Sequence, residues 1–186
     1  MKNTFYLAAL LATSCAYAAE KVTDGSFENI AASPYSCLSG TQGPWTFTGR
    51  TCLLQEDHDN GGTGPQTPYG LNYLDFFSHA GSPGTGVATQ KLKGLTSGTY
   101  TLSYAYLIVH PATKDCTFTT TYGSQTIDTL VLPHDAVGSE TNWVTHTASF
   151  KPAKLNGPLS ITLNCPPPAK PQWVFGLDNI SIVGPS

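Results

Sequence analysis

Two carboxylates near opposite ends of the chain, Glu28 and Asp178, could together bind a cation. In residues 173–183 the apolar side chains change parity at Asp178-Asn179, with Phe175 and Leu177 before that point and Ile180 and Ile182 after it. A β-bulge adds one residue to a strand, which restores the phase and turns the Asp178 side chain to a new direction. Residues 22–28 predict another short strand. If the two strands share a sheet, Glu28 approaches Asp178, and two carboxylates brought together favour a bound cation.

Aromatic residues on one face of a predicted strand could bind a sugar. In residues 71–77, Tyr73, Asp75 and Phe77 share one face, opposite Leu74 and Phe76, which we assign to the core. Large aromatic groups on a solvent-facing sheet are costly unless they have a role, and their rings can stack on a pyranose. For Tyr73 and Phe77, sugar binding and ordinary packing are both compatible with the pattern.

Trp143 could border the same groove as those three residues. The next residues of its strand, Val144, Ala148 and Phe150, have the opposite parity and belong to the core in this interpretation. The same parity also directs His146 inward, which is unusual for a histidine. We therefore take Tyr73, Asp75, Phe77 and Trp143 as the candidate carbohydrate-binding residues.

The acidic sequence Glu56-Asp57-His58-Asp59 could suggest glycoside hydrolysis, but its setting argues against that chemistry. Two catalytic carboxylates need a separation of roughly 5 to 10 Å on a rigid frame. Neighbouring residues in a Gly-rich loop offer no such frame. The five histidines are scattered, and no Gly-x-Ser-x-Gly elbow or phosphate loop is present. We therefore assign no catalytic residue and expect that the protein is not an enzyme.

The N-terminus and the cysteines predict a secreted protein. Residues 1–18 have an apolar run followed by Ala16-Tyr-Ala18, which predicts a signal peptide and a mature domain from 19 to 186. Lipoprotein processing at Cys15 is the alternative. Four cysteines then remain and allow three disulfide pairings, of which we favour Cys37 with Cys52 and Cys116 with Cys165. The alternative, a zinc site, lacks Cys-x-x-Cys spacing.

Charge and composition favour an uncharged polar partner. The full chain of 186 residues carries a net charge of −3, and only 11% of its residues are charged. No basic patch is present, which argues against nucleic acid. No hydrophobic tail follows the last strand, so membrane insertion is not expected. A low-charge, aromatic-rich surface is typical of glycan binding.

The elements that must position these residues are short strands. Alternating or β-branched runs separated by Gly, Pro and Asn signals predict eight to ten strands and no helix. They include residues 44–48, 71–77, 87–92, 99–109, 116–122, 125–132, 143–150, 159–164 and 173–183. This spacing predicts an all-β fold in which two antiparallel sheets form a β-sandwich or jelly roll.

The two ends of the chain resemble those of a known family. Asp24-Gly-Ser-Phe-Glu28 and Phe175-Gly-Leu-Asp-Asn-Ile-Ser-Ile182 are similar to the terminal strands of carbohydrate-binding modules of families four, nine and twenty-two, which have a galactose-binding-like jelly roll. Residues 90–104 and 143–150 resemble the central turn and strand and a late strand of these modules. The resemblance implies a structural calcium at Glu28 and Asp178, supplemented by carbonyls of residues 24–26. The family often has Asp-Asp where this chain has Asp178-Asn179.

The resemblance and the residues together predict a secreted, monomeric, non-catalytic protein that binds a polysaccharide or oligosaccharide on a concave sheet. Aromatic stacking and hydrogen bonds would supply the affinity. Two alternatives remain open at this point. One is an extracellular or cell-wall interaction protein, such as an adhesin or effector, that uses the same fold to bind a protein. The other is a small glycan-cleaving enzyme.

Overall fold

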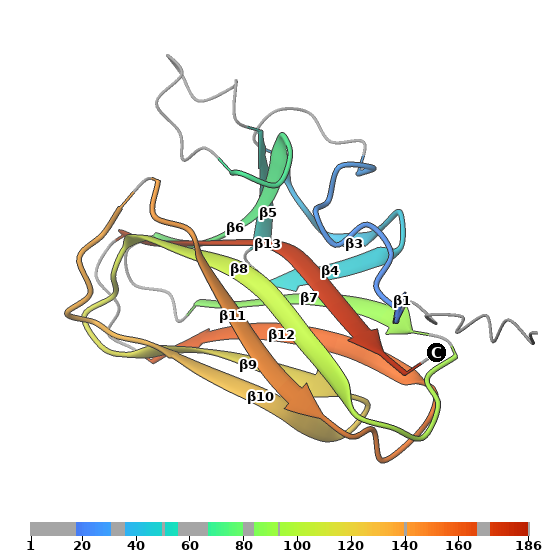
Figure 1. Ribbon diagram of the computed structural model, residues 1–186. Helices are drawn as coiled ribbons and strands as arrows, with labels where there is room; N and C mark the ends of the chain where they lie inside the picture. The colour runs from blue at the N-terminus through green and yellow to red at the C-terminus, as the bar shows by residue number, and fades with distance from the viewer. Residues whose placement is uncertain are drawn as a thin grey trace, which may run out of the picture.

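The computed structural model describes residues 18–30, 36–49, 51–55, 67–79, 84–92, 94–139, 141–166 and 172–185. In these residues the chain is all β, and two antiparallel sheets pack face to face, which confirms the predicted sandwich (Figure 1). None of the described residues forms an apolar helix long enough to cross a membrane. The predicted signal peptide comprises residues 1–18, of which residues 1–17 lie outside the described residues.

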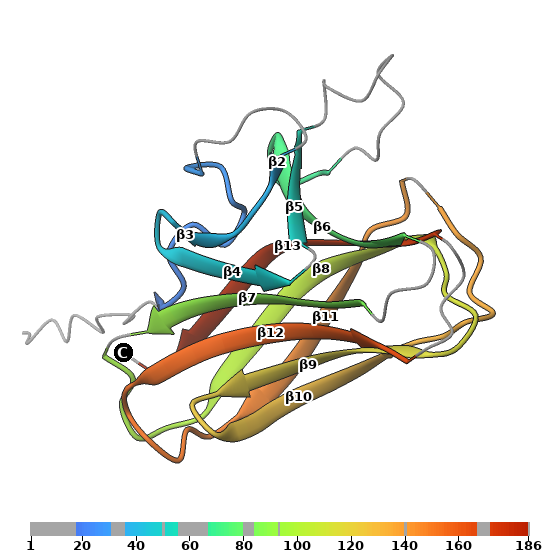
Figure 2. The ribbon, with the colours of Figure 1, turned by 180° about the vertical axis from the view of Figure 1, so that it is seen from behind.

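One sheet has seven strands in the order β11-β8-β13-β6-β5-β2, with β1 also paired to β13. Its strands are β1 (Ala19–Glu20), β2 (Ser36–Cys37), β5 (Thr51–Gln55), β6 (Asn72–His79), β8 (Tyr100–His110), β11 (Val144–Phe150) and β13 (Gln172–Gly184). The other sheet has six strands in the order β10-β9-β12-β7-β4-β3 and lies in front in the reverse view (Figure 2). Its strands are β3 (Gly40–Gln42), β4 (Trp45–Gly49), β7 (Gly84–Leu92), β9 (Cys116–Tyr122), β10 (Gln125–Leu132) and β12 (Gly157–Cys165).

The core lies between the two sheets and is built from alternate residues of each strand. On β9 every second residue is buried, because successive side chains of a strand point to opposite faces. Phe76 of β6 packs edge-on against Phe118 of β9, with ring centroids 5.5 Å apart. The core also contains further large aromatic residues that are buried: Trp45, Tyr100, Tyr104, Phe150 and Phe175.

The bulge predicted at Asp178-Asn179 is present in β13. Asp178 pairs with Ala105 of β8, but Ser181 pairs with Ser103, so β13 has one extra residue between these pairs. Asn179 accommodates it with a φ of 49° in the left-handed region. Phe175 and Ile180, which have opposite parity, therefore both reach the core. The strand changes direction along its length (Figure 1).

The strand predicted over residues 22–28 is wrong, because these residues form turns after the short strand β1. This N-terminal segment is held to both sheets by polar contacts that the sequence did not reveal. The Glu20 carboxylate accepts hydrogen bonds from three backbone N–H groups, those of Lys21, Val22 and Ile182. The buried Gln90 amide of β7 both donates to and accepts from the backbone of Thr23. After the bulge, the Ile180 N–H donates to the carbonyl of Gly25 at 2.9 Å, and a side chain at position 25 would collide with Ile180.

Two disulfides confirm the favoured pairing. Cys37–Cys52 joins β2 to β5, and Cys116–Cys165 joins β9 to β12. Each disulfide connects neighbouring strands of one sheet, so it reinforces a pairing that the backbone hydrogen bonds already make.

The inward-facing histidine of β11 has a partner on the other sheet. His146 Nε2 lies 3.0 Å from Asp128 Oδ2 of β10, and the Tyr104 hydroxyl donates to the same oxygen at 2.8 Å. A register shift in β10 next to Asp128 marks a bulge there. These contacts link the edge strand of one sheet to the edge strand of the other, so His146 can lie on the core-facing side of β11 because its nitrogen contacts a carboxylate.

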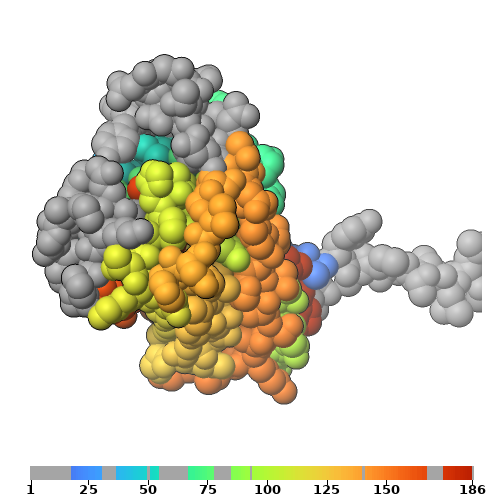
Figure 3. All heavy atoms as spheres, turned by 90° about the vertical axis from the view of Figure 1, so that its left-hand side faces the viewer, coloured from blue at the N-terminus to red at the C-terminus, as the bar shows by residue number. Residues whose placement is uncertain are grey.

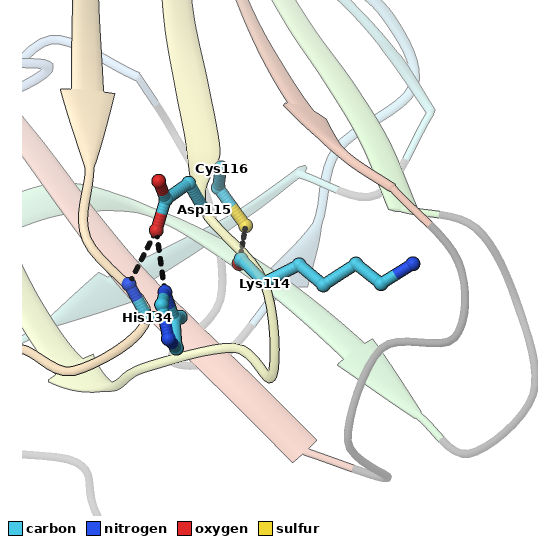
Figure 4. A network of polar contacts seen from close by, with 4 residues as sticks. All are labelled: Lys114, Asp115, Cys116 and His134. Carbon is cyan, nitrogen blue, oxygen red and sulfur yellow. Dashed lines mark hydrogen bonds and ion pairs between the residues drawn. The ribbon is translucent and has the colours of Figure 1, made fainter.

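An exposed hydrogen-bonded pair, Asp115 and His134, joins the residue before β9 to the segment after β10 (Figure 4). We call this pair the clasp. Asp115 Oδ1 accepts from the His134 N–H at 2.9 Å and contacts His134 Nδ1 at 2.7 Å. The hydrogen bond to Asp115 raises the pKa of His134 above 6.5. A raised folded-state pKa means that this clasp contributes to stability below pH 6.5 and loses that contribution as the pH rises through the pKa of His134.

We expect Asp115→Asn to lower the pKa of His134, because the substitution removes the carboxylate charge and weakens the hydrogen bond that favours the imidazolium. A two-dimensional NMR titration of the histidine ring protons measures this shift directly. An unchanged His134 titration in the variant would contradict the clasp.

Candidate functional site

The candidate site lies on the outer face of the seven-stranded sheet, which is the face turned away from the six-stranded sheet. Leu74 and Phe76 of β6 belong to the core, so Tyr73, Asp75 and Phe77 point to the outer face, as the sequence predicted. The strand register arranges this face in cross-strand rows. One row contains Thr145 of β11, Ala105 of β8 and Asp178 of β13, and the next contains Leu107 of β8, Gly176 of β13 and Asp75 of β6.

The residues predicted on β6 are more buried than an open sugar platform requires. Tyr73 is 2% exposed and Asp75 is 3% exposed, whereas Phe77 is half-buried. The Tyr73 ring packs edge-on against the indole of Trp143, with ring centroids 5.4 Å apart. The structure thus brings Tyr73 and Trp143 together. Of the aromatic residues predicted for the site, Phe77 and Trp143 are the two that remain partly exposed.

Trp143 reaches this face because the connection between β10 and β11 folds back along β8. The Ser139 N–H donates to the carbonyl of Ile108 at 2.9 Å. In the space-filling view this connection (orange) lies beside the end of β8 (yellow-green) (Figure 3). A Cβ atom at position 176 would be only 2.8 Å from the indole of Trp143. The indole therefore lies on the backbone of Gly176, and only glycine leaves room for it there.

A second half-buried aromatic residue, Tyr69, lies over the neighbouring row. It belongs to residues 67–72, which precede and enter β6 and which we call the strap. The Tyr69 and Thr145 hydroxyls are 3.2 Å apart, and the Thr67 hydroxyl donates to Asp178 Oδ2. The strap thus contacts both ends of the row whose middle residue is Ala105. Sequence reasoning missed Tyr69, because an isolated Tyr-Gly in a turn carries no periodic signal.

Glu28 and Asp178, the predicted metal ligands, both bind the strap. Glu28 Oε1 accepts from the backbone N–H groups of Leu71 at 2.9 Å and Asn72 at 2.8 Å. Asp178 accepts from the Asn179 N–H at 2.6 Å in addition to Thr67. Burial raises the pKa of Asp178 to about 7; the hydrogen bonds from Thr67 and Asn179 oppose this rise, and the charge of Glu28 adds to it. Both carboxylates therefore already have protein donors.

Two buried oxygens without hydrogen-bond partners could serve as ligands for a hard cation; one is on Asn72, whose backbone contacts Glu28, and one is on Asp24, four residues before Glu28. Asn72 is 4% exposed; its amide nitrogen donates to the carbonyl of Phe27, while its Oδ1 has no hydrogen-bond partner. Asp24 Oδ2 is also buried without a partner. Asp24 and Phe27 have φ values of 54° and 61°, a left-handed conformation that is unusual for a bulky residue such as Phe27. This oxygen-rich donor set fits Ca²⁺, which takes carboxylates, amide oxygens and carbonyls.

Acidic, histidine and cysteine side chains do not by themselves make a metal centre here. No group of three or more such side chains gathers among the residues that the structure describes. A cation at this place would therefore need the amide and carbonyl oxygens as well. The acidic sequence Glu56-Asp57-His58-Asp59 lies outside the described residues, so its position relative to this site is not part of the structure.

Comparison with known proteins establishes the fold. No family model and no curated protein matches the sequence. Among solved structures, a Stig cyclase from Fischerella sp. TAU, in complex with (3Z)-3-(1-methyl-2-pyrrolidinylidene)-3H-indole, is 15% identical with a TM-score of 0.61, covering 90% of this chain and 98% of the cyclase. The carbohydrate-binding module TmCBM61, in complex with β-1,4-galactotriose, is 11% identical with a TM-score of 0.59, covering 90% and 99%.

A third similar structure is a domain of a larger enzyme. The arabinose-bound α-L-arabinofuranosidase MgGH51 is 14% identical with a TM-score of 0.61, and the match covers 91% of this chain but 27% of the enzyme. These likenesses show that the chain has a β-sandwich fold shared by a carbohydrate-binding module, by cyclases and by a domain of a glycosidase. At such low identity the function has to be argued from the site itself.

Proposed function

We propose that this protein is a secreted, non-catalytic carbohydrate-binding protein whose ligand lies on the outer face of the seven-stranded sheet. The observation that carries the proposal is the placement of two half-buried aromatic residues over adjacent rows of this face. Trp143 lies on Gly176, and Tyr69 spans the row that contains Ala105. Small residues beneath the rings leave room for the aromatic groups.

The neighbouring polar groups suit a neutral, hydroxylated ligand. The exposed Thr145 hydroxyl and the Tyr69 hydroxyl can each donate and accept hydrogen bonds. The low share of charged residues, 11%, favours an uncharged partner over an ionic one. Support also comes from TmCBM61, which has the same fold and was solved with an oligosaccharide. Stacking and hydrogen bonding would hold the sugar without covalent change.

We further propose that a structural calcium accompanies this site. Glu28 and Asp178 would supply carboxylate oxygens, and the unpartnered Asn72 Oδ1 would add an amide oxygen. A divalent cation would offset the repulsion between the two carboxylates. The competing interpretation is that these carboxylates serve only as acceptors for the strap and the bulge. Both roles use the same residues, so a calcium titration is needed to separate them.

Substitution of the two aromatic residues tests the glycan proposal. We expect Trp143→Ala and Tyr69→Ala each to weaken oligosaccharide binding at least about tenfold, which corresponds to about 1.4 kcal/mol. Isothermal titration calorimetry with an oligosaccharide that the wild type binds gives the affinities. Val131→Ala is the control, because it removes an exposed apolar side chain from the other sheet. Unchanged affinity in both aromatic variants would place the ligand elsewhere.

A further inference from the structure

The strap is anchored at both ends by the candidate cation ligands. At its beginning, the Thr67 hydroxyl donates to Asp178. At its end, the backbone N–H groups of Leu71 and Asn72 donate to Glu28 at 2.9 and 2.8 Å. The side chain that stands between these anchors is Tyr69, which we place in the glycan site. One segment of six residues therefore contacts both the carboxylate pair and the proposed ligand.

The strap also spans much of the outer face. It continues into β6, its Thr67 contact is on β13, and its Tyr69 contact is on β11. In the sheet order, β8 lies between β11 and β13. A change at the Asp178 end can thus reach Thr145 on β11, the third strand from β6 in the sheet, through a single short segment. The contacts at the two ends of this path are the hydrogen bond from Thr67 to Asp178 and the one between the Tyr69 and Thr145 hydroxyls.

We propose that the strap couples the two sites, so that a divalent cation at Glu28 and Asp178 and an oligosaccharide at Tyr69 and Trp143 each strengthen the binding of the other. This inference rests on the function proposed above. A cation would hold both carboxylates in place and offset their mutual repulsion, which fixes the two anchors of the strap. Tyr69 is then ordered before the sugar arrives, so sugar binding costs less conformational entropy. Thermodynamic linkage makes the effect reciprocal.

Hydrogen exchange measured by mass spectrometry tests the first half of the coupling on the intact protein, without any glycan. We expect calcium chloride, compared with a chelator, to slow exchange of the peptide that covers residues 67–72 roughly fivefold or more. A peptide from β9 should not change. Glu28→Gln should abolish the calcium effect, whereas Asp135→Asn, which removes an exposed carboxylate in the β10–β11 connection, should preserve it. Calcium binding without protection of the strap, or no binding of calcium at all, would overturn the proposal.

A substitution on β11 tests whether the Tyr69 contact is coupled to the cation site, and it leaves the carboxylates in place. Thr145→Val removes the hydroxyl that contacts Tyr69, and we expect the calcium affinity, measured by calorimetry with calcium alone, to fall several-fold. Thr147→Val, on the same face of β11 two residues later, is the matched control and should bind calcium as the wild type does. Equal calcium affinity in the Thr145→Val variant and the wild type would overturn the coupling.

These measurements separate the two proposals. The hydrogen-exchange and calorimetric tests of the coupling both use calcium alone, so a failure to find a glycan ligand leaves their outcome unchanged. Conversely, loss of glycan affinity in Trp143→Ala would uphold glycan binding even if calcium left the strap unprotected. If Glu28→Gln does not fold, the Thr145→Val comparison still decides the coupling, because Thr145 is exposed and lies on β11, which one strand, β8, separates from the strand that carries Asp178.

Discussion

In the presence of a chelator, the wild type should lose a few kcal/mol of stability between pH 4 and pH 8, and Asp178→Asn should not. Burial raises the pKa of Asp178 to about 7 in the folded protein, whereas an unfolded aspartate titrates near about 3.9. Between these values the folded state binds more protons. Its stability is therefore greatest below the unfolded pKa and falls by up to about 1.4 kcal/mol per pH unit as the pH rises through the folded pKa.

Urea unfolding at a series of pH values measures this difference. The asparagine keeps the shape of the aspartate and can still accept from Asn179 or Thr67, so the variant should be more stable than the wild type at pH 8. Asp135→Asn is the control for loss of an exposed negative charge, and its pH profile should follow that of the wild type. Parallel pH profiles for the wild type and Asp178→Asn would contradict a destabilising buried carboxylate.

Removal of the Cys116–Cys165 disulfide should cost more than removal of Cys37–Cys52. A disulfide restricts the unfolded chain, and the restriction grows with the length of the closed loop. The sequence separations are 49 and 15 residues, respectively. We expect losses of about 4 and about 3 kcal/mol for the double alanine variants.

Denaturant unfolding of the two double variants beside the wild type provides the comparison. Cys52, Cys116 and Cys165 are all buried, so both variants also create small cavities, and the difference between them is more informative than either value. A smaller loss for the Cys116–Cys165 pair would contradict the loop-length argument. It would indicate that the longer loop is already restricted in the unfolded chain.

Periodicity predicted what depends on alternation along a single strand. The parity change at Asp178 indicated the bulge, and the opposite parities of Tyr73 and Leu74 assigned their faces correctly. Paired cysteines in a β-rich chain indicated the disulfides. Each of these features leaves a mark within a few residues, because a strand has a period of two and a bulge shifts it by one.

Contacts made by connections between strands were not predictable in the same way. The burial of Tyr73 depends in part on Trp143, which the β10–β11 connection brings over Gly176. The strap residue Tyr69 reaches a strand far along the chain, and no local pattern announces that contact. His146 looked anomalous in the sequence because its partner, Asp128, belongs to the other sheet. Long-range packing decides such cases.

The most direct test of glycan binding is a glycan array probed with the mature wild-type protein, once with calcium and once with chelator. We expect binding to one class of neutral oligosaccharide, with weaker binding in chelator. Binding of the Trp143→Ala variant on the same array should be lost. No binding to any glycan in either condition would contradict the proposed carbohydrate-binding function and would favour a protein partner for this fold.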